Sequence, residues 1–162
     1  MSLPPLPATD SIDALSDAML AASGVLAAIT LRALAEADAP ITLVQFRTLV
    51  LVSNRGPINL ATLAHDLGVQ PSTTSRMVER LVQVNLLERR ISPHSRRELR
   101  VEVTDRGRAL VERVTRRRYR EIQDLVERIS DAERLGLMRG LSAFAAAGIA
   151  MRAGPMVEQI WP

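Results

Sequence analysis

The chain has 162 residues, of which 47% are hydrophobic, and carries a formal net charge of +3. This length and apolar content suit one compact domain with a hydrophobic core and exclude a chain that is disordered throughout. Cysteine is absent, which excludes disulfides, thiolate metal ligands and thiol-based redox sensing.

Membrane segments are not predicted. No uninterrupted apolar run reaches the ~18 residues that a bilayer requires, and residues 1–10 lack the basic start of a signal peptide. The sequence therefore predicts a cytoplasmic protein with no membrane partner. Residues 1–9, rich in proline, are expected to form a disordered tail, and residues 153–162 a C-terminal tail.

The first predicted helix ends at about Asp38, before Pro40. Its apolar residues recur at alternating three- and four-residue steps, the period of an amphipathic helix: Ile12, Leu15, Met19, Ala22, Leu26, Ile29 and Ala33. Thr42 and Gln45 then form a capping-box signature. This signature predicts a second, largely buried helix that ends near Asn54.

Two helices with a tight join follow. A turn-spaced apolar face predicts a third helix over residues 60–67, which Gly68 ends, and Pro71 suits the first turn of a fourth helix. Only about three residues separate the two, and such a tight join distinguishes a helix-turn-helix from an ordinary helical pair.

The fourth helix is predicted to present a polar face. Four of its residues are expected to face inward: Thr74, Met77, Val78 and Leu81. The outward residues carry hydroxyl or guanidinium groups: Ser72, Thr73, Ser75, Arg76 and Arg80. Hydroxyls donate to phosphates or base edges, and arginine can bridge two acceptors of guanine, so these five are predicted to contact DNA. A hydroxyl-rich surface helix without a partner is the plainer alternative.

The hydrophobic period changes to that of strands after the fourth helix. Residues 87–91 and 99–103 alternate, and residues 93–98 connect them, which predicts a β-hairpin, the wing of a winged helix. An arginine in a narrow minor groove meets an enhanced negative potential. Four arginines of the hairpin are therefore predicted to contact DNA: Arg89, Arg90, Arg96 and Arg97.

A fifth helix is predicted over residues 104–130, and Ser130 with Glu133 caps a last helix. From Arg89 to Arg120 twelve arginines accompany four acidic residues, a local cation excess that suits a phosphate backbone, although solvated helix faces show such runs too. The first and last helices carry apolar stripes, so they pack within the chain or pair with a second copy. A two-fold dimer places its recognition helices about 34–36 Å apart on DNA, and we therefore predict a homodimer.

Three runs of residues resemble the MarR family of bacterial transcriptional regulators: 68–81 (GVQPSTTSRMVERL), 89–97 (RRISPHSRR) and 104–107 (TDRG). The resemblance extends over residues 10–152. It implies a homodimeric winged-helix repressor whose terminal helices pair, whose fourth helix enters the major groove and whose wing arginine enters the minor groove. The family commonly carries an aspartate two residues before that arginine, here Arg97. Ser95 stands at this position, which implies a weaker wing contact.

Enzyme chemistry is not predicted. His65 and His94 lie in separate elements without the spacing of a metal site or of a nucleophile and its base, and the sequence has no glycine-rich phosphate loop. Catalytic residues, metals and cofactors are therefore not expected. Two other functions stay open: a protein that coats DNA without sequence preference, and a winged-helix module that contacts another protein.

The sequence thus predicts a mainly α fold with a small β-hairpin: a winged helix-turn-helix region (residues 41–104) with a helical dimerisation region (residues 10–38 and 105–152). The predicted function is a sequence-specific DNA-binding repressor on a pseudo-palindromic operator. By resemblance, its effector is a small amphipathic or phenolic anion between the dimer helices and the winged domain. Arg47 and residues 116–118 are candidates for the counter-charge, a solvated helix face being their alternative role.

Overall fold

The computed structural model describes residues 12–37, 39, 41–92 and 95–151, without the side chains of residues 92–98 and 149–151. The predicted tails, residues 1–9 and 153–162, lie outside the described residues. The described part of the chain forms six helices and three strands, in this order: α1 (Ile12–Ala35), α2 (Leu43–Arg55), β1 (Ile58–Asn59), α3 (Leu60–Leu67), α4 (Pro71–Gln83), β2 (Leu87–Ser92), β3 (Ser95–Val103), α5 (Asp105–Val126) and α6 (Asp131–Met151).

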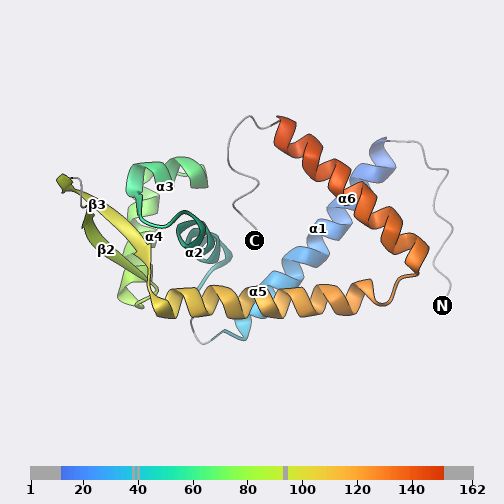
Figure 1. Cartoon of the computed structure of the whole chain (residues 1–162), viewed down its shortest axis with the longest axis horizontal. Coiled ribbons are helices and arrows are strands. Elements are labelled where there is room, and N and C mark those ends of the chain that lie inside the picture. The colour runs from blue at the N-terminus through green and yellow to red at the C-terminus, as the bar shows by residue number, and fades with distance from the viewer. Residues whose placement is uncertain (1–11, 38, 40, 93–94, 152–162) are drawn as a thin grey trace.

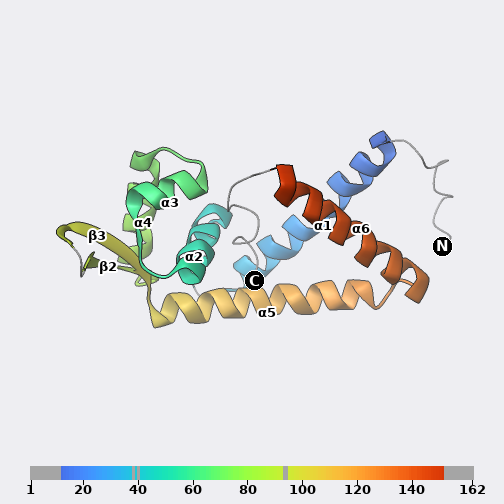
Figure 2. The same ribbon diagram turned by 45° about the horizontal axis from the view of Figure 1, so that its top comes forward.

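The long helix α5 runs along one side of the molecule and connects its two parts (Figure 1). Helices α2, α3 and α4 gather with strands β2 and β3 at one end, and α6 lies with the N-terminal part of α1 at the other. Figure 2, turned by 45°, shows the same division. The fold is mainly helical with a small antiparallel sheet and a winged helix-turn-helix at one end, so the predicted fold class is confirmed.

The predicted caps of the winged domain are present. Thr42 and Gln45 form the capping box at the start of α2, where each side chain accepts a hydrogen bond from the other residue's backbone amide. Gly68 ends α3 in the left-handed conformation at φ 67°, which glycine adopts without steric cost, and Pro71 opens α4. These local signals define the helix-turn-helix.

One core unites the winged domain with the first half of α5. Its fully buried side chains come from α2, α3, α4, the turn after α4, the sheet and α5: Phe46, Leu49, Val52, Leu63, Val78, Leu81, Leu86, Leu87, Val101, Leu110 and Val114. An ion pair between Arg55 at the end of α2 and Asp66 of α3 borders this core, and the Asp66 side chain is only 7% exposed. The orientation of the helix-turn-helix thus depends on apolar packing and on one largely buried charge pair.

The sheet differs from the predicted hairpin in two respects. Its strand order is β1-β3-β2, and the two-residue strand β1 pairs with β3 through Ile58 and Val101, which the sequence did not predict. Two residues are too few to show a period, and only the tertiary pairing defines them. The second strand begins at Ser95, so the predicted connection over residues 93–98 is too long.

Two helices end earlier than predicted. Helix α1 ends at Ala35, where the Ala37 amide donates to the Leu34 carbonyl in a tighter turn. Helix α5 ends at Val126, and the Arg134 guanidinium donates to the carbonyls of Val126 and Glu127 (2.9 Å each). A side chain from the next helix thus satisfies carbonyls that a longer α5 would have bonded internally, and the periodic apolar pattern could not reveal this.

The apolar stripes of α1 and α6 are largely exposed in the single chain. Ile12 of α1 is 82% exposed and Phe144 of α6 is 61% exposed. The other exposed apolar residues of these helices are Leu15, Leu20, Val25, Leu26, Leu31, Leu135, Leu137, Met138 and Leu141. A surface of this kind marks an interaction site rather than scattered apolar positions.

Helix α1 is also long and apolar enough to cross a membrane, judged by length and composition alone. The prediction that no segment meets this requirement is therefore wrong, because alanine-rich turns raise the mean hydropathy without forming an unbroken apolar run. Core helices pass the same test, and the C-terminal part of α1 is packed: Ile29, Thr30, Ala33 and Leu34 are buried.

Ion pairs connect α5 with the last turn of α1 and with Glu36, the residue that follows α1. The Arg32 guanidinium lies 2.7 Å from the Glu121 carboxylate, and Arg117 lies 3.1 Å from Glu36 and 3.2 Å from Glu121. The hydrogen bond from Arg32 is the main cause that holds the pKa of Glu121 below its usual range. Glu121 is therefore the carboxylate that both arginines share in the ion pairs of this junction.

The junction should make stability depend on pH. A carboxylate whose folded-state pKa is lowered stabilises the fold at neutral pH, and this contribution is lost as the pH falls through the folded value. Between about pH 5 and pH 3, the Tm of the wild-type protein should fall more steeply than that of Glu121→Gln, measured by circular dichroism. Glu127→Gln, which removes an exposed carboxylate near the end of α5, is the control and should keep the wild-type slope.

Candidate nucleic-acid interface

Helix α4 has the two faces that its sequence predicts. Thr74, Met77, Val78 and Leu81 are buried, and the Thr48 hydroxyl of α2 lies 3.3 Å from the Met77 sulfur beneath the helix. On the opposite face four of the predicted contact residues are exposed and one, Ser75, is half-buried; the exposed four are Ser72, Thr73, Arg76 and Arg80. The structure therefore brings these hydroxyl and guanidinium groups together on one outer face.

One acidic residue shares this face and was not among the predicted contacts. Glu79, 62% exposed, lies one helical turn after Arg76, and its carboxylate is 4.0 Å from the guanidinium of Arg89 on β2. Glu79 is the only acidic residue in α4. It lies seven residues, about two helical turns, after Ser72, so the sequence already indicated that both side chains lie on the same face. Glu79 partly offsets the charge of Arg89 and holds it beside the recognition helix.

Arg90 is bound by two carboxylates of the sheet. Its guanidinium lies 2.7 Å from Glu88 on the same strand and 3.1 Å from Glu102 on β3. The hydrogen bond to Glu88 is the main cause that raises the pKa of Arg90. Glu88 and Glu102 are direct partners in the strand register, and two like charges in such positions repel each other. This arrangement favours a role for Arg90 in holding the strands together over a role in DNA contact.

The side chains of the other two predicted wing contacts, Arg96 and Arg97, lie outside the described residues, and so does that of Ser95. Their backbone belongs to β3, which runs from Ser95 to Val103 at the base of the wing. Their part in the interface stays a prediction.

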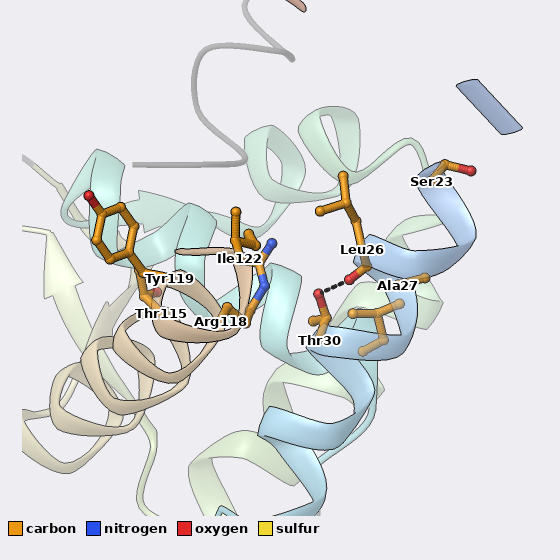
Figure 3. Close-up of a pocket in the computed structure, with 9 residues that line it drawn as sticks. Ser23, Leu26, Ala27, Thr30, Thr115, Arg118, Tyr119 and Ile122 are labelled. Carbon is orange, nitrogen blue, oxygen red and sulfur yellow. Dashed lines mark hydrogen bonds between the residues drawn. The ribbon is translucent and has the colours of Figure 1, made fainter. Parts of the chain in front are cut away.

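A cavity of about 500 Å³ opens between α1 and α5, beside the winged domain. Figure 3 shows Arg118 reaching from α5 toward Thr30 and Leu26 of α1. Arg118 is 8% exposed, and burial lowers its pKa, although a guanidinium stays charged at neutral pH. The described residues that line the cavity are apolar or carry hydroxyls, apart from Arg118: Ser23, Leu26, Ala27, Thr30, Leu43, Thr115, Tyr119 and Ile122.

Among the candidate counter-charges, the structure separates Arg118 from the others. Arg116 and Arg117 line a different depression, with Glu36 just after α1, and Arg47 of α2 is not among the residues of the cavity. Arg117 and Arg118 are neighbours in sequence but lie in different depressions, because successive side chains of a helix point about 100° apart. The sequence showed only a run of three arginines.

Comparison with known proteins identifies the family. The sequence profile of the MarR family matches residues 41–99, which span α2 to the first half of β3. The chain is 53% identical to RV1404 of Mycobacterium tuberculosis, whose crystal structure agrees with a TM-score of 0.82 over 89% of this chain and 99% of that one. The chain belongs to the MarR family. Members of this family are transcriptional regulators, in agreement with the prediction that the protein is not an enzyme.

More distant relatives agree with this assignment. YfiV, an uncharacterized HTH-type transcriptional regulator of Bacillus subtilis, is 23% identical to this MarR-family chain over 103 residues, which is 64% of either protein and thus less than two thirds of YfiV. The structure of FabT of Streptococcus pneumoniae, solved in complex with DNA, is similar over 88% of this chain and 100% of the FabT chain, with a TM-score of 0.73. At 15% identity FabT shows the fold alone.

The role of Arg90 in this MarR-family protein can be tested by removing its partners together with it. Arg90→Gln should weaken DNA binding, because it leaves Glu88 and Glu102 facing each other and the phosphates. The triple variant with Glu88→Gln and Glu102→Gln should regain wild-type affinity, measured by fluorescence anisotropy on one duplex. A triple variant as weak as Arg90→Gln would instead show that the Arg90 charge itself contacts DNA.

Proposed function

We propose that the protein is a dimeric, sequence-specific DNA-binding regulator that represses transcription in the cytoplasm by occupying a pseudo-palindromic operator. The observation that carries the proposal is the outer face of α4, where hydroxyls and guanidinia are exposed opposite a buried inner face that is apolar except for Thr74. A helix of this kind at the outside of a helix-turn-helix suits the major groove. The contacts that we propose are the predicted ones apart from Arg90, which is paired with Glu88 and Glu102: Ser72, Thr73, Ser75, Arg76, Arg80, Arg89, Arg96 and Arg97.

A homodimer is the second part of the proposal. A groove of about 480 Å³ between α1 and α6 is lined by apolar residues such as Leu15, Leu141 and Phe144. Gly136 and Gly140 lie in the same groove, and a methyl group added to either would meet no atom within 4 Å. A second copy that packs there would bury the exposed stripes of both helices and place two recognition helices on one operator.

Selection of bound fragments from random duplexes tests the proposal directly. The selected sites should be pseudo-palindromes with half-sites about one helical turn apart. Affinity should fall with salt by ~0.9 log units per log unit of salt for each phosphate neutralised. A protein that coats DNA would bind all duplexes alike, and a flat salt dependence would contradict DNA binding and favour a protein-contact module.

Arg76 should read a base. If its guanidinium bridges two acceptors of guanine, Arg76→Ala should cost about 1–3 kcal/mol at one position of each half-site and change the preferred base there. Arg128→Ala, which removes an exposed arginine beyond the end of α5, is the matched control and should leave the preference unchanged. An equal loss of affinity on every sequence would limit Arg76 to a phosphate contact.

We also propose that a small amphipathic or phenolic anion releases the protein from DNA by binding in the α1–α5 cavity. The buried guanidinium of Arg118 supplies the counter-charge, and the apolar walls accept the hydrophobic part of the ligand. Such a ligand releases DNA only if its affinity differs between two conformations of the protein. It must bind the conformation that is unable to bind the operator more tightly than the conformation that binds it.

Titration of phenolic acids into the protein–operator complex tests this effector class. The acids should lower DNA affinity, and their uncharged methyl esters should not. Arg118→Met should weaken the effect of the acids roughly tenfold, since it removes a charged hydrogen-bond donor but keeps the volume. Arg120→Met, two residues along α5 and outside the cavity, should respond as the wild type does. Release by the esters as well would contradict the role of the charge.

A further inference from the structure

The turn after the recognition helix and the start of α5 form one hydrogen-bonded joint. The Thr104 hydroxyl donates to the carbonyl of Asn85 (2.8 Å) and accepts from the amide of Gly107 (3.0 Å). The Thr104 amide donates to the carbonyl of Leu86 (3.2 Å). Thr104 is thus the N-cap of α5 and, with the same side chain, a clamp on the turn that follows α4.

Gly107 brings α5 into direct contact with this turn. A Cβ added to Gly107 would lie 2.1 Å from the carbonyl oxygen of Leu86 and 2.8 Å from a methyl carbon of Val103. The first is a backbone atom, so no side-chain rotation could relieve the clash. The absence of a side chain at Gly107 thus allows the first turn of α5 to contact the backbone of the turn that follows α4.

The same turn is bonded to α4 and to the base of the wing. The amides of Asn85 and Leu86 donate to the carbonyls of Val82 and Leu81 (2.9 Å each), and Asn85 adopts φ 56°, which turns the chain sharply. Leu86 and Leu81 are fully buried beneath the joint. Leu87, the next residue, pairs with Val103 at the base of the wing. Three elements therefore meet within a few residues and have little freedom to turn against one another.

We propose that Thr104 and Gly107 are positioning residues that lock α4, the wing and α5 into one rigid body. This inference rests on the proposed dimeric function. Helix α5 has 22 residues, about 33 Å at 1.5 Å per residue, and leads from the joint toward the dimerisation helices. With a rigid joint, the dimer contact fixes the position of each recognition helix relative to the other. The protein therefore binds only operators whose half-sites have one spacing.

Operators with altered spacing test the inference. Two added base pairs rotate one half-site by about 70° and shift it by about 7 Å relative to the other. The wild-type protein should bind the native spacing much more tightly than the altered one. Thr104→Val, which keeps the side-chain shape but loses the hydroxyl, should lower this ratio of affinities about fivefold or more, the usual size of a coupling between sites. Thr104→Ser should keep the wild-type ratio.

Thr42→Val is the matched control, because it also removes a helix N-cap but lies at α2, away from the joint. It should keep the spacing ratio even if it lowers the Tm as much as Thr104→Val does. An unchanged ratio in Thr104→Val, or an equal loss in Thr42→Val, would overturn the inference.

A measurement without DNA separates this inference from the proposed function. The chain has no cysteine, so Gln83→Cys on α4 and Glu127→Cys after α5 accept two spin labels specifically. In labelled protein diluted with unlabelled protein, the label-to-label distance distribution should be narrow and should broaden only in Thr104→Val. An equally broad distribution in the unmutated background would overturn the rigid joint even if the operator is bound. A narrow distribution in a protein that binds no two-fold site would contradict the proposed function and leave the joint supported.

Discussion

The close approach of Gly107 to the carbonyl of Leu86 sets the direction in which α5 leaves the winged domain. The core of the winged domain packs against the first half of this helix, and α1 crosses its second half. A side chain at this position would push α5 off the turn that follows α4. The arrangement of α4 relative to α5 therefore depends on this backbone contact, which the hydrogen bonds of Thr104 reinforce.

The α1–α5 crossing has opposite chemistry on its two sides. On one side Glu121 holds Arg32 and Arg117 in ion pairs, and on the other a largely apolar cavity contains the buried Arg118. Exposed ion pairs contribute little to stability, but Glu121 is mostly shielded from solvent, so its pairs are less screened. The ligand that we propose for the cavity would therefore act on the same contact between α1 and α5 as the ion pairs opposite it.

Much of the winged domain was predictable from the sequence, because its signals are local. The capping box of Thr42, the left-handed Gly68, the Pro71 start of α4 and the inner face of that helix all follow from backbone geometry and a 3.6-residue period. The alternation of the wing strands was equally clear. The family resemblance rested on these same residues, and the profile match over residues 41–99 agrees with it.

What the sequence by itself determined was which elements form and which of their faces are polar, since these properties depend on neighbours a few positions away. Only the tertiary structure decided which charges meet. Arg90 and Arg118 look alike in sequence, each within a run of arginines, yet one is bound between Glu88 and Glu102 and the other is buried beside an apolar cavity. Charge pairing and burial depend on residues that are distant in the chain, and no local pattern records that distance.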